Sequence, residues 1–162
     1  MTLEEYIKDN FHYNPETGDL WRKCKNYYRL CDTINKTSEN YFRVQVLKKR
    51  YFVHRICWFL YYCIWPDDQI DHVNGITNDN RIDNLREATA SQNQMNAKLS
   101  SNNTSGYKGV VYIHDRQKWR AQITLNNKMI YIGIFSTKEA AFEAYKNKAQ
   151  QLFGEFNYFD NR

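Results

Sequence analysis

The sequence lacks a segment that could cross a membrane and a leader that could direct export. No run of eighteen apolar residues occurs without a charged residue. The first residues, MTLEEYIKDNF, begin acidic and do not show the basic and then apolar pattern of a secretory leader. These two absences argue against membrane and exported proteins, and we expect a soluble intracellular protein.

Cysteines are also few, and their spacing argues against a zinc knuckle. The four cysteines are Cys24, Cys31, Cys57 and Cys63, and neither neighbouring pair has the gap of two to four residues that such a site uses. Two disulfides or a different metal site remain alternatives. Because Cys57 and Cys63 lie in an aromatic run, we favour free thiols that act as small buried apolar groups in a reducing compartment.

The charge balance is mildly basic. The 162 residues contain 23 Lys and Arg against 18 Asp and Glu, for a formal net charge of +5, which favours a polyanionic partner. Residues 100–162 have nine basic and five acidic side chains, whereas residues 1–99 have fourteen and thirteen. We therefore expect the last third of the chain to bind the polyanion. The length allows one medium domain or two small ones, and we expect two.

The first half of the chain predicts a short helix, two hairpins and a buried helix. Residues 3–10 have a helical pattern, and FHYNPETGDLWRK predicts two strands around a turn in which Gly18 can adopt positive φ. YFRVQVLKKRYFVH alternates between apolar and polar residues and predicts a hairpin closed by Lys48 and Lys49. HRICWFLYYCIW is apolar on all sides and predicts a buried helix of about three turns that Pro66 ends.

The last part of the chain predicts a separate module. KLSSNNTSG is rich in Ser and Asn and has no periodicity, so we expect a first domain over 1–99, a linker over 100–106 and a second domain over 107–162. The second domain has strand candidates at 108–113, 119–125 and 128–135.

A turn and a helix complete this module. Asn126 and Asn127 are expected to close the hairpin between the last two strands. Ser136, with Glu139 three residues later, predicts a capping box for an Ala-rich helix that ends at Gly154. The expected architecture is a three-stranded antiparallel sheet with one helix, which makes the fold class α+β.

The segment QIDHVNGITNDNRIDNLREATASQNQMNA holds the candidate chemistry. Its pattern predicts a strand, a long turn, a second strand and a helix that Thr89 or Ser91 caps. We expect this small finger to lean on the preceding helix through apolar side chains, since it cannot bury enough surface alone. Those side chains are Ile70, Ile82, Leu85 and Met95.

Asp71 and His72 are adjacent, so in a regular strand they point to opposite faces, and a shared site requires a distortion or a strand end. Asp71 could then bind a cation while His72 acts on a water molecule, and Asn93 could complete the cation's ligands from the helix. Carboxylate, amide, phosphate and water oxygens suit Mg²⁺. Spacing alone favours the alternative, a chance Asp-His pair in a turn rich in Asn, over catalysis.

The stretch from Val53 to Asn96 resembles the HNH endonuclease family in its phage and homing branch, in which a ββα-metal finger reads D-H-x-N-G, N-R-x-x-N-L and a helix with a further Asn. The resemblance implies that Asp71 and Asn93 bind the metal and that His72 is the general base. It implies that Asn84 fixes the orientation of the imidazole. Asn96 is a second candidate for the helix position.

The implied reaction is hydrolysis of a DNA phosphodiester, in which His72 takes a proton from water and Mg²⁺, or Mn²⁺ as a substitute, stabilises charge at the scissile phosphate. Double-stranded DNA is the implied partner, with no membrane and no obligate protein partner, in a bacterial or phage-infected cell. A homing or nicking role is implied as well. His54 is a candidate brace or a packing residue, and His12 and His114 receive no role.

The stretch from Ser105 to about Asn157 resembles the AP2 domain, whose sheet face binds the DNA major groove, through Y-K-G-V, K-W-R-A and I-G-x-F. Alternation along the strands separates an apolar face, covered by Ala141, Ala144, Tyr145 and Leu152, from an exposed face. The candidate DNA-binding residues are Lys108, Arg120, Gln122, Thr124, Met129 and Tyr131.

The sequence therefore predicts a metal-dependent HNH endonuclease that an AP2-like module delivers to DNA. One alternative is a DNA-binding protein or regulator that does not cut DNA and keeps a degenerate HNH scaffold. A second alternative is an RNA-directed or structural protein whose aromatic residues stack on bases.

Overall fold

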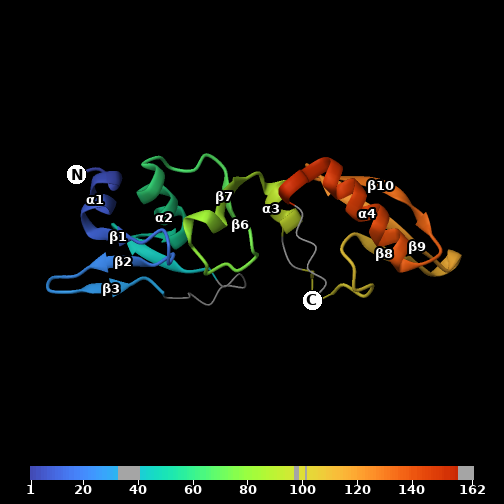
Figure 1. Cartoon of the computed structure of the whole chain (residues 1–162), viewed down its shortest axis with the longest axis horizontal. Coiled ribbons are helices and arrows are strands. Elements are labelled where there is room, and N and C mark those ends of the chain that lie inside the picture. Colours follow the sequence, from blue (N-terminus) through green and yellow to red (C-terminus); the bar gives the residue numbers. More distant parts are fainter. Residues whose placement is uncertain (33–40, 97–98, 101, 157–162) are drawn as a thin grey trace. The chain divides into compact units, whose positions relative to one another are not determined.

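The structure is a computed structural model that describes residues 1–32, 41–96, 99, 100 and 102–156. It divides into two compact units, a first unit over Met1–Ala88 and a second unit over Thr89–Arg162, and each is described by itself (Figure 1). The described residues form four α-helices and several small antiparallel sheets, which confirms the α+β class. Within the described residues, none of the helices has the length and apolar character needed to span a bilayer.

The first unit begins with a helix and a three-stranded sheet in the order β1-β2-β3. The elements are α1 (Leu3–Asn10), β1 (Phe11–Tyr13), β2 (Leu20–Lys23) and β3 (Tyr28–Leu30). Gly18 has a φ of +80° in the turn between β1 and β2, as predicted. Strand β3 was not predicted, because its short sequence has no apolar alternation.

A second hairpin follows, formed by β4 (Arg43–Val46) and β5 (Lys49–Phe52). The prediction that Lys48 and Lys49 close it was wrong by one residue: Leu47 and Lys48 have φ values of 45° and 69°, and Lys49 already pairs with Val46. Two residues of positive φ match the twist of a tight hairpin turn. The turn position was missed because an apolar, γ-branched residue rarely adopts positive φ.

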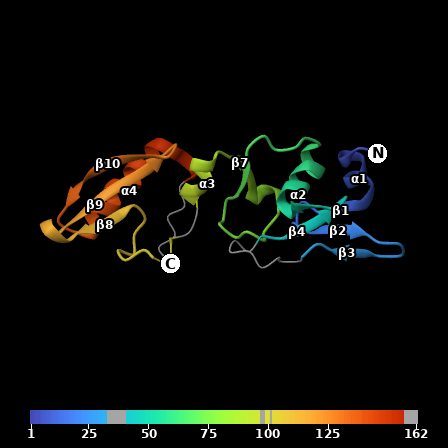
Figure 2. The same cartoon turned by 180° about the vertical axis from the view of Figure 1, so that it is seen from behind.

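Helix α2 (Val53–Tyr62) is the centre of the first core. It buries Val53, Ile56, Cys57, Trp58 and Phe59. The helix ends at Cys63, which has a φ of 61°, three residues before the expected stop at Pro66. Strands β1 and β5 lie next to this helix, and Figure 2 shows β1 beside it. The core that results joins apolar side chains of α1, both hairpins and α2.

The remaining strands of the first unit are β6 (Gln69–His72) and β7 (Leu85–Ala88), which pair antiparallel. A loop and the short 3-10 helix η1 (Ile82–Asn84) connect them. Ile70 and Leu85 are buried in the first core, as predicted. Strand, long turn and strand therefore occur where the sequence placed them.

The second unit begins with α3 (Ala90–Asn96), which Thr89 caps: its hydroxyl accepts from the Gln92 amide, and its own amide donates to the Gln92 side chain. The rest consists of β8 (Val110–Ile113), η2 (His114–Arg116), β9 (Lys118–Leu125), β10 (Lys128–Phe135), α4 (Lys138–Phe153) and η3 (Gly154–Phe156). Met95 of α3 belongs to the core of this second unit, which corrects the expectation that it packs with Ile70 and Leu85.

The sheet of the second unit has the order β10-β9-β8 and is antiparallel, as predicted, and α4 lies against all three strands. Asn126 and Asn127 form the turn, with φ values of 50° and 60°. The N-cap of α4 is Thr137, whose hydroxyl accepts from the Ala140 amide, and not Ser136 as predicted. Adjacent hydroxyl residues can each cap a helix, and the sequence pattern cannot rank them.

Candidate active site

The site is built around the end of β6. Asp71 and His72 are the last two residues of this strand, and each side chain is 3% exposed. Asp71 pairs with Arg86 and His72 pairs with Leu85 in the ladder with β7. The two side chains therefore point to opposite faces, and His72 lies at the strand end that a shared site requires.

The imidazole of His72 is held by an amide that the sequence did not single out. His72 Nε2 lies 3.0 Å from Oδ1 of Asn80, and both side chains are buried. Burial lowers the pKa of His72 below its ordinary value, against the opposing effects of the Asn80 hydrogen bond and the charges of Asp71 and Asp79. The imidazole is therefore held neutral in one orientation.

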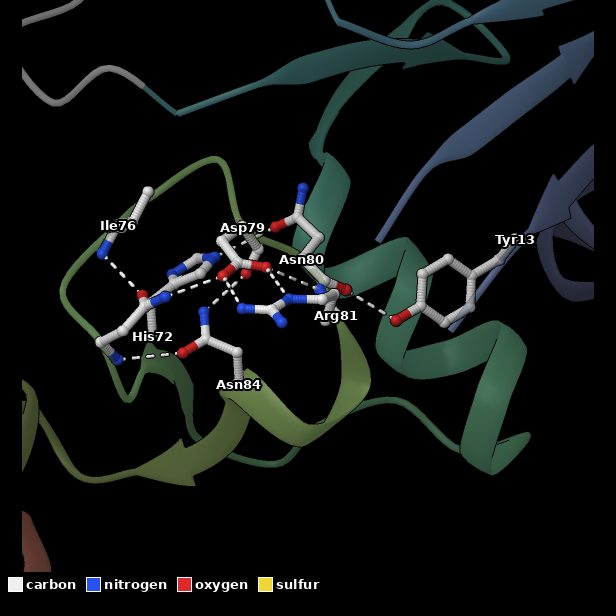
Figure 3. Close-up of polar contacts among 8 residues, drawn as sticks. Tyr13, His72, Ile76, Asp79, Asn80, Arg81 and Asn84 are labelled. Carbon is white, nitrogen blue, oxygen red and sulfur yellow. Dashed lines mark hydrogen bonds and ion pairs between the residues drawn. The ribbon is translucent and has the colours of Figure 1, made fainter. Parts of the chain in front are cut away.

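Asn80 is in turn fixed by the first hairpin of the chain. The Tyr13 hydroxyl donates to the Asn80 carbonyl at 2.6 Å, as Figure 3 shows. The Ile82 amide donates to the carbonyl of Pro15 at 3.0 Å. A Cβ atom on Gly18 would lie 2.6 Å from the Arg81 nitrogen. The turn between β1 and β2 thus packs against the backbone that presents Asn80 to His72.

Asn84 braces the loop between β6 and η1. Its Oδ1 accepts from the Asn74 amide at 2.9 Å, and its Nδ2 donates to the Asp79 carbonyl at 2.7 Å (Figure 3). These contacts of Asn84 are with the loop, whereas Asn80 is the amide that contacts the imidazole. Asn84 therefore holds the loop that carries Asn80.

Asp79 is a second anchor of this loop. Its carboxylate forms an ion pair with Arg81 at 2.6 Å and accepts from Nδ2 of Asn74 at 2.7 Å. The hydrogen bond from Arg81 is the main reason that the pKa of Asp79 is lowered to about 2. The carboxylate is therefore ionised at neutral pH and holds both ends of the loop.

The carboxylate of Asp71 faces a cation of the protein. Nε and Nη2 of Arg86 lie 2.9 Å and 2.8 Å from the same oxygen, Oδ2. Arg86 is 16% exposed, so this is a mostly buried ion pair across the β6–β7 ladder. Both arginine contacts use one oxygen of the carboxylate.

His54, at the start of α2, lies in an aromatic cluster with His72. The two imidazole rings meet edge to face with centroids 5.3 Å apart, and Phe52 stacks on His54 at 5.2 Å. Tyr41 lies 5.2 Å from His54 and 5.8 Å from His72. Burial, with smaller effects of His72 and Arg55, lowers the pKa of His54 to about 3. His54 is therefore a neutral ring that covers one side of His72.

Asn93, the predicted metal ligand on the helix, lies on α3 in the second unit and is half-buried. Because Asp71 belongs to the first unit, the pairing of these two side chains stays a prediction. Asn96 is buried on the same helix. Among the described residues, no group of three or more His, Cys, Asp and Glu side chains could hold a metal ion.

The structure places Lys108 differently from the other DNA-binding candidates. Its Nζ donates to the carbonyls of Gln94 and Met95 at the C-terminal end of α3. Burial lowers the pKa of Lys108 to about 8. A cation in this position satisfies helix carbonyls that have no partner within the helix, which is a capping role.

The remaining candidates lie on the sheet face away from α4. Ala121 and Ile123 are buried under the helix, whereas Thr124, Met129 and Tyr131 are exposed. Arg120 and Gln122 alternate with the buried residues of β9, and within the described residues Arg120 Nε and Gln122 Oε1 have no hydrogen-bond partner. A shallow depression of about 660 Å³ includes Arg120 and Tyr131 in its lining.

Sequence reasoning missed Asn80 and Arg86 and left the role of His54 open. Asn80 lies in the run NGITNDN, where no periodicity shows which amide turns inward. Arg86 could have been found, because a cation opposite an acidic residue is a common cross-strand pair. That inference would have required the register of β6 and β7, which places Arg86 opposite Asp71.

These buried polar residues lie in a stretch of sequence that matches a known protein family. Residues 51–95 match the family described as HNH endonuclease. The match spans β5, α2, the β6–β7 pair and most of α3.

Two viral proteins are similar to the chain. Protein 3.8 of Escherichia phage T7 is 32% identical over 90 residues, which cover 56% of this chain and 74% of that protein. A protein of Acanthamoeba polyphaga mimivirus, described as an uncharacterized HNH endonuclease, is 36% identical over 90 residues, or 56% of this chain and 46% of that protein. The chain therefore belongs to the family of Protein 3.8 and contains an HNH endonuclease domain. No solved structure matches it.

Proposed function

We propose that this protein is a divalent-metal-dependent endonuclease that hydrolyses DNA phosphodiester bonds with its HNH domain. The observation that carries the proposal is the buried, neutral imidazole of His72, fixed by Asn80 at 3.0 Å and adjacent to the carboxylate of Asp71, within residues that match the HNH family. General-base hydrolysis needs a neutral imidazole held in one orientation, and Asp71, on the opposite face of the same strand end, is the proposed metal ligand.

The hydrogen bond with Asn80 supports His72 as the proposed base. When Asn80 Oδ1 accepts, Nε2 of His72 carries the proton, and Nδ1 holds the lone pair that takes a proton from the attacking water. His54 and Tyr41 cover the ring and keep it from rotating. Asn80, Asn84 and Asp79 position the base and do not themselves react.

Asp71 and Asn93 are proposed to hold Mg²⁺, or Mn²⁺ as a substitute. Their donor set fits, since a carboxylate oxygen and an amide oxygen, with phosphate and water, suit a hard cation. When bound, the ion stabilises negative charge at the scissile phosphate and the departing oxygen. Nε and Nη2 of Arg86 both contact Oδ2 of Asp71, so Arg86 competes with the ion for the carboxylate.

The second unit is proposed to be AP2-like and to deliver the nuclease to DNA. Its three-stranded sheet, covered on one face by α4, supports this proposal, as does the position of Arg120 and Gln122 on the face away from that helix. Arg can read guanine and Gln can read adenine in the major groove. Thr124, Met129 and Tyr131 extend the same face, and a tethered reader raises the local concentration of DNA at the site.

The decisive experiment is a plasmid-nicking assay with Mg²⁺, with Mn²⁺ and with EDTA. Nicking should require the metal, and His72→Ala should lower the rate by about 10² to 10⁴ while DNA binding persists, since general-base catalysis has that range. His114→Ala is the matched control, because His114 is exposed in the second unit. Undiminished nicking by His72→Ala would exclude the proposed base.

A second candidate function is a DNA-binding protein that keeps the HNH scaffold without cutting DNA. The ion pair with Arg86 favours it, because a carboxylate already neutralised by a guanidinium is a weaker metal ligand. This candidate predicts DNA binding without nicking under every metal condition. Arg120→Ala with Gln122→Ala should weaken DNA binding about tenfold or more under either candidate, as each reader contributes about 1 to 3 kcal/mol.

A further inference from the structure

The basic residues of the first unit are concentrated in its two hairpins. Residues 22–50 contain nine Lys and Arg against two Asp and Glu, although the whole chain has a net charge of only +5. The remaining residues of the chain are therefore net acidic. Residues 1–99 as a whole have nearly equal numbers of basic and acidic side chains, so a count over that range does not show this strongly cationic stretch.

The β4–β5 hairpin orients part of this charge. Gln45 faces Arg50 and Arg43 faces Phe52 across the hairpin. Partners in an antiparallel ladder project to the same face, and positions two apart share it, so these four side chains lie on one face. The other face presents Val44, Val46 and Tyr51 to the first core. The face with the two arginines is therefore the outer one.

This outer face leads directly to the candidate active site. The Arg43 guanidinium lies 4.3 Å from the centre of the Phe52 ring, Phe52 stacks on His54 at 5.2 Å, and His54 meets His72 at 5.3 Å. Exposure falls along the same path: Arg50 is exposed, Arg43 is half-buried and His72 is buried. A line of side chains thus runs from the hairpin surface to the proposed base.

Within the described residues, no carboxylate neutralises the two arginines. The Nε of Arg43 is buried and has no hydrogen-bond partner among the described residues. Arginine binds phosphate through several N–H donors that lie in one plane. The guanidinium of Arg43 lies over the Phe52 ring, which is a cation–π contact.

We propose that the outer face of the β4–β5 hairpin binds the phosphate backbone of the DNA strand that enters the active site, with Arg50 and Arg43 each pairing with a phosphate. The proposal rests on the nuclease function, and it adds a DNA contact within the first unit that is independent of the sheet in the second. The ligand chemistry is a phosphodiester backbone, so this contact is insensitive to base sequence. The face guides the strand toward His72.

The test measures binding of a fluorescein-labelled duplex oligonucleotide of random sequence in EDTA, over a series of KCl concentrations. Arg43→Gln with Arg50→Gln should lower the slope of log affinity against log salt by about 1.8, because each phosphate contact contributes about 0.9, and should weaken binding about tenfold. Arg50→Gln alone should give half of the change in slope. Since Arg50 is exposed, this single variant tests the contact without a risk to folding.

The matched control is Lys23→Gln with Lys25→Gln, which removes two exposed charges from the β2–β3 hairpin of the same unit. It should change the slope clearly less than the arginine pair. Equal losses would mean that net charge alone attracts DNA, and the proposed path would be wrong. Arg43→Lys with Arg50→Lys should largely keep the slope, and a loss there would assign the arginines a structural role.

Failure of this proposal can be separated from failure of the nuclease function. Binding in EDTA requires no cleavage, so a protein that binds DNA through the two arginines and never nicks would keep the hairpin contact and lose the nuclease proposal. Metal-dependent nicking that is unchanged in KM and rate by both arginine substitutions would keep the nuclease and overturn the hairpin contact.

Discussion

The two units differ in how many polar side chains they bury. Of the buried polar or charged residues among those described, His54, Asp71, His72, Asn80 and Asn84 lie in the first unit, and the second unit has only Asn96 and Ser105. The second unit instead fills its interior with apolar side chains of α4 and the sheet. Because burial of polar groups costs stability unless they are paired, the first unit gives up stability for a fixed chemical site.

The largest expected effect is on the buried ion pair of the first unit. Arg86→Leu leaves the carboxylate of Asp71 without its guanidinium, and we expect the free energy of unfolding to fall by about 3 to 5 kcal/mol. Chemical denaturation measures it. Arg86→Leu combined with Asp71→Asn should recover most of this loss, since both charges are then absent. Mg²⁺ should stabilise Arg86→Leu more than the wild type if Asp71 binds the ion.

One glycine in each unit allows a comparison of how closely the surrounding backbone packs. Gly18 and Gly106 have φ values of +80° and +78°, but a Cβ on Gly18 would meet backbone atoms, and one on Gly106 would meet nothing within 4 Å. Gly18→Ala should therefore cost about 2 kcal/mol or more, and Gly106→Ala about 1 kcal/mol. Thermal unfolding checks both. Equal costs would show that the first hairpin does not press on the Asn80–Arg81 backbone.

Asn80 tests whether the polar interior positions the base. Asn80→Ala should lower the nicking rate about 10- to 100-fold with little change in DNA affinity, because the imidazole loses the partner that fixes its tautomer. Tyr13→Phe, which removes only the hydroxyl contact to the Asn80 carbonyl, should have a smaller effect. Full activity of Asn80→Ala would assign the orientation of His72 to other groups.

Asp79 makes the stability of the first unit depend on pH. Its pKa is lowered to about 2 in the folded protein from an ordinary value of 3.8, so its ionised form contributes stability above about pH 4, and this contribution is lost as pH falls toward 2. Asp79→Asn should cost about 1 to 2 kcal/mol at neutral pH. Urea titrations over this pH range should show the difference between wild type and variant disappearing at the acid end.

The smallest expected effect lies in the second unit. Lys108→Met removes the ammonium that caps the C-terminal carbonyls of α3, and we expect a loss of about 1 kcal/mol in the free energy of unfolding. Lys118→Met is the control, because Lys118 is exposed at the start of β9. If Lys108→Met changes DNA affinity but not stability, Lys108 binds DNA as the sequence suggested.

How well the sequence predicted these features depended on whether a local rule decided them. The Asn126–Asn127 turn and the cap at Gly154 follow from backbone preferences of single residues, and both were confirmed. Asp71 and His72 were singled out because an acidic residue and a histidine end an apolar strand, and their catalytic roles stay a prediction. Asn80 could not be found, since its inward orientation depends on Tyr13 and Gly18, more than sixty residues earlier.

The hairpin arginines show a different kind of limit. A charge count over long segments averages the cations of β2–β5 with the acidic residues around them, and the sequence therefore pointed to the last third of the chain as the basic part. Only the ladder register places Arg43 and Arg50 on one face with Phe52. Charge totals over a segment predict the class of partner that the protein binds. The pairing of the strands is needed to locate the surface that binds it.

The boundary between Ala88 and Thr89 falls inside the stretch that matches the HNH family, because α3 shares a core with the second unit. An exchange of C-terminal parts between related genes at this boundary would replace α3, and with it Asn93, together with the sheet of the second unit. An exchange that preserves all of α3 must fall after Asn96. The chimeric protein would then have to rebuild the packing around Met95, so the HNH stretch and the second unit are constrained to be inherited together.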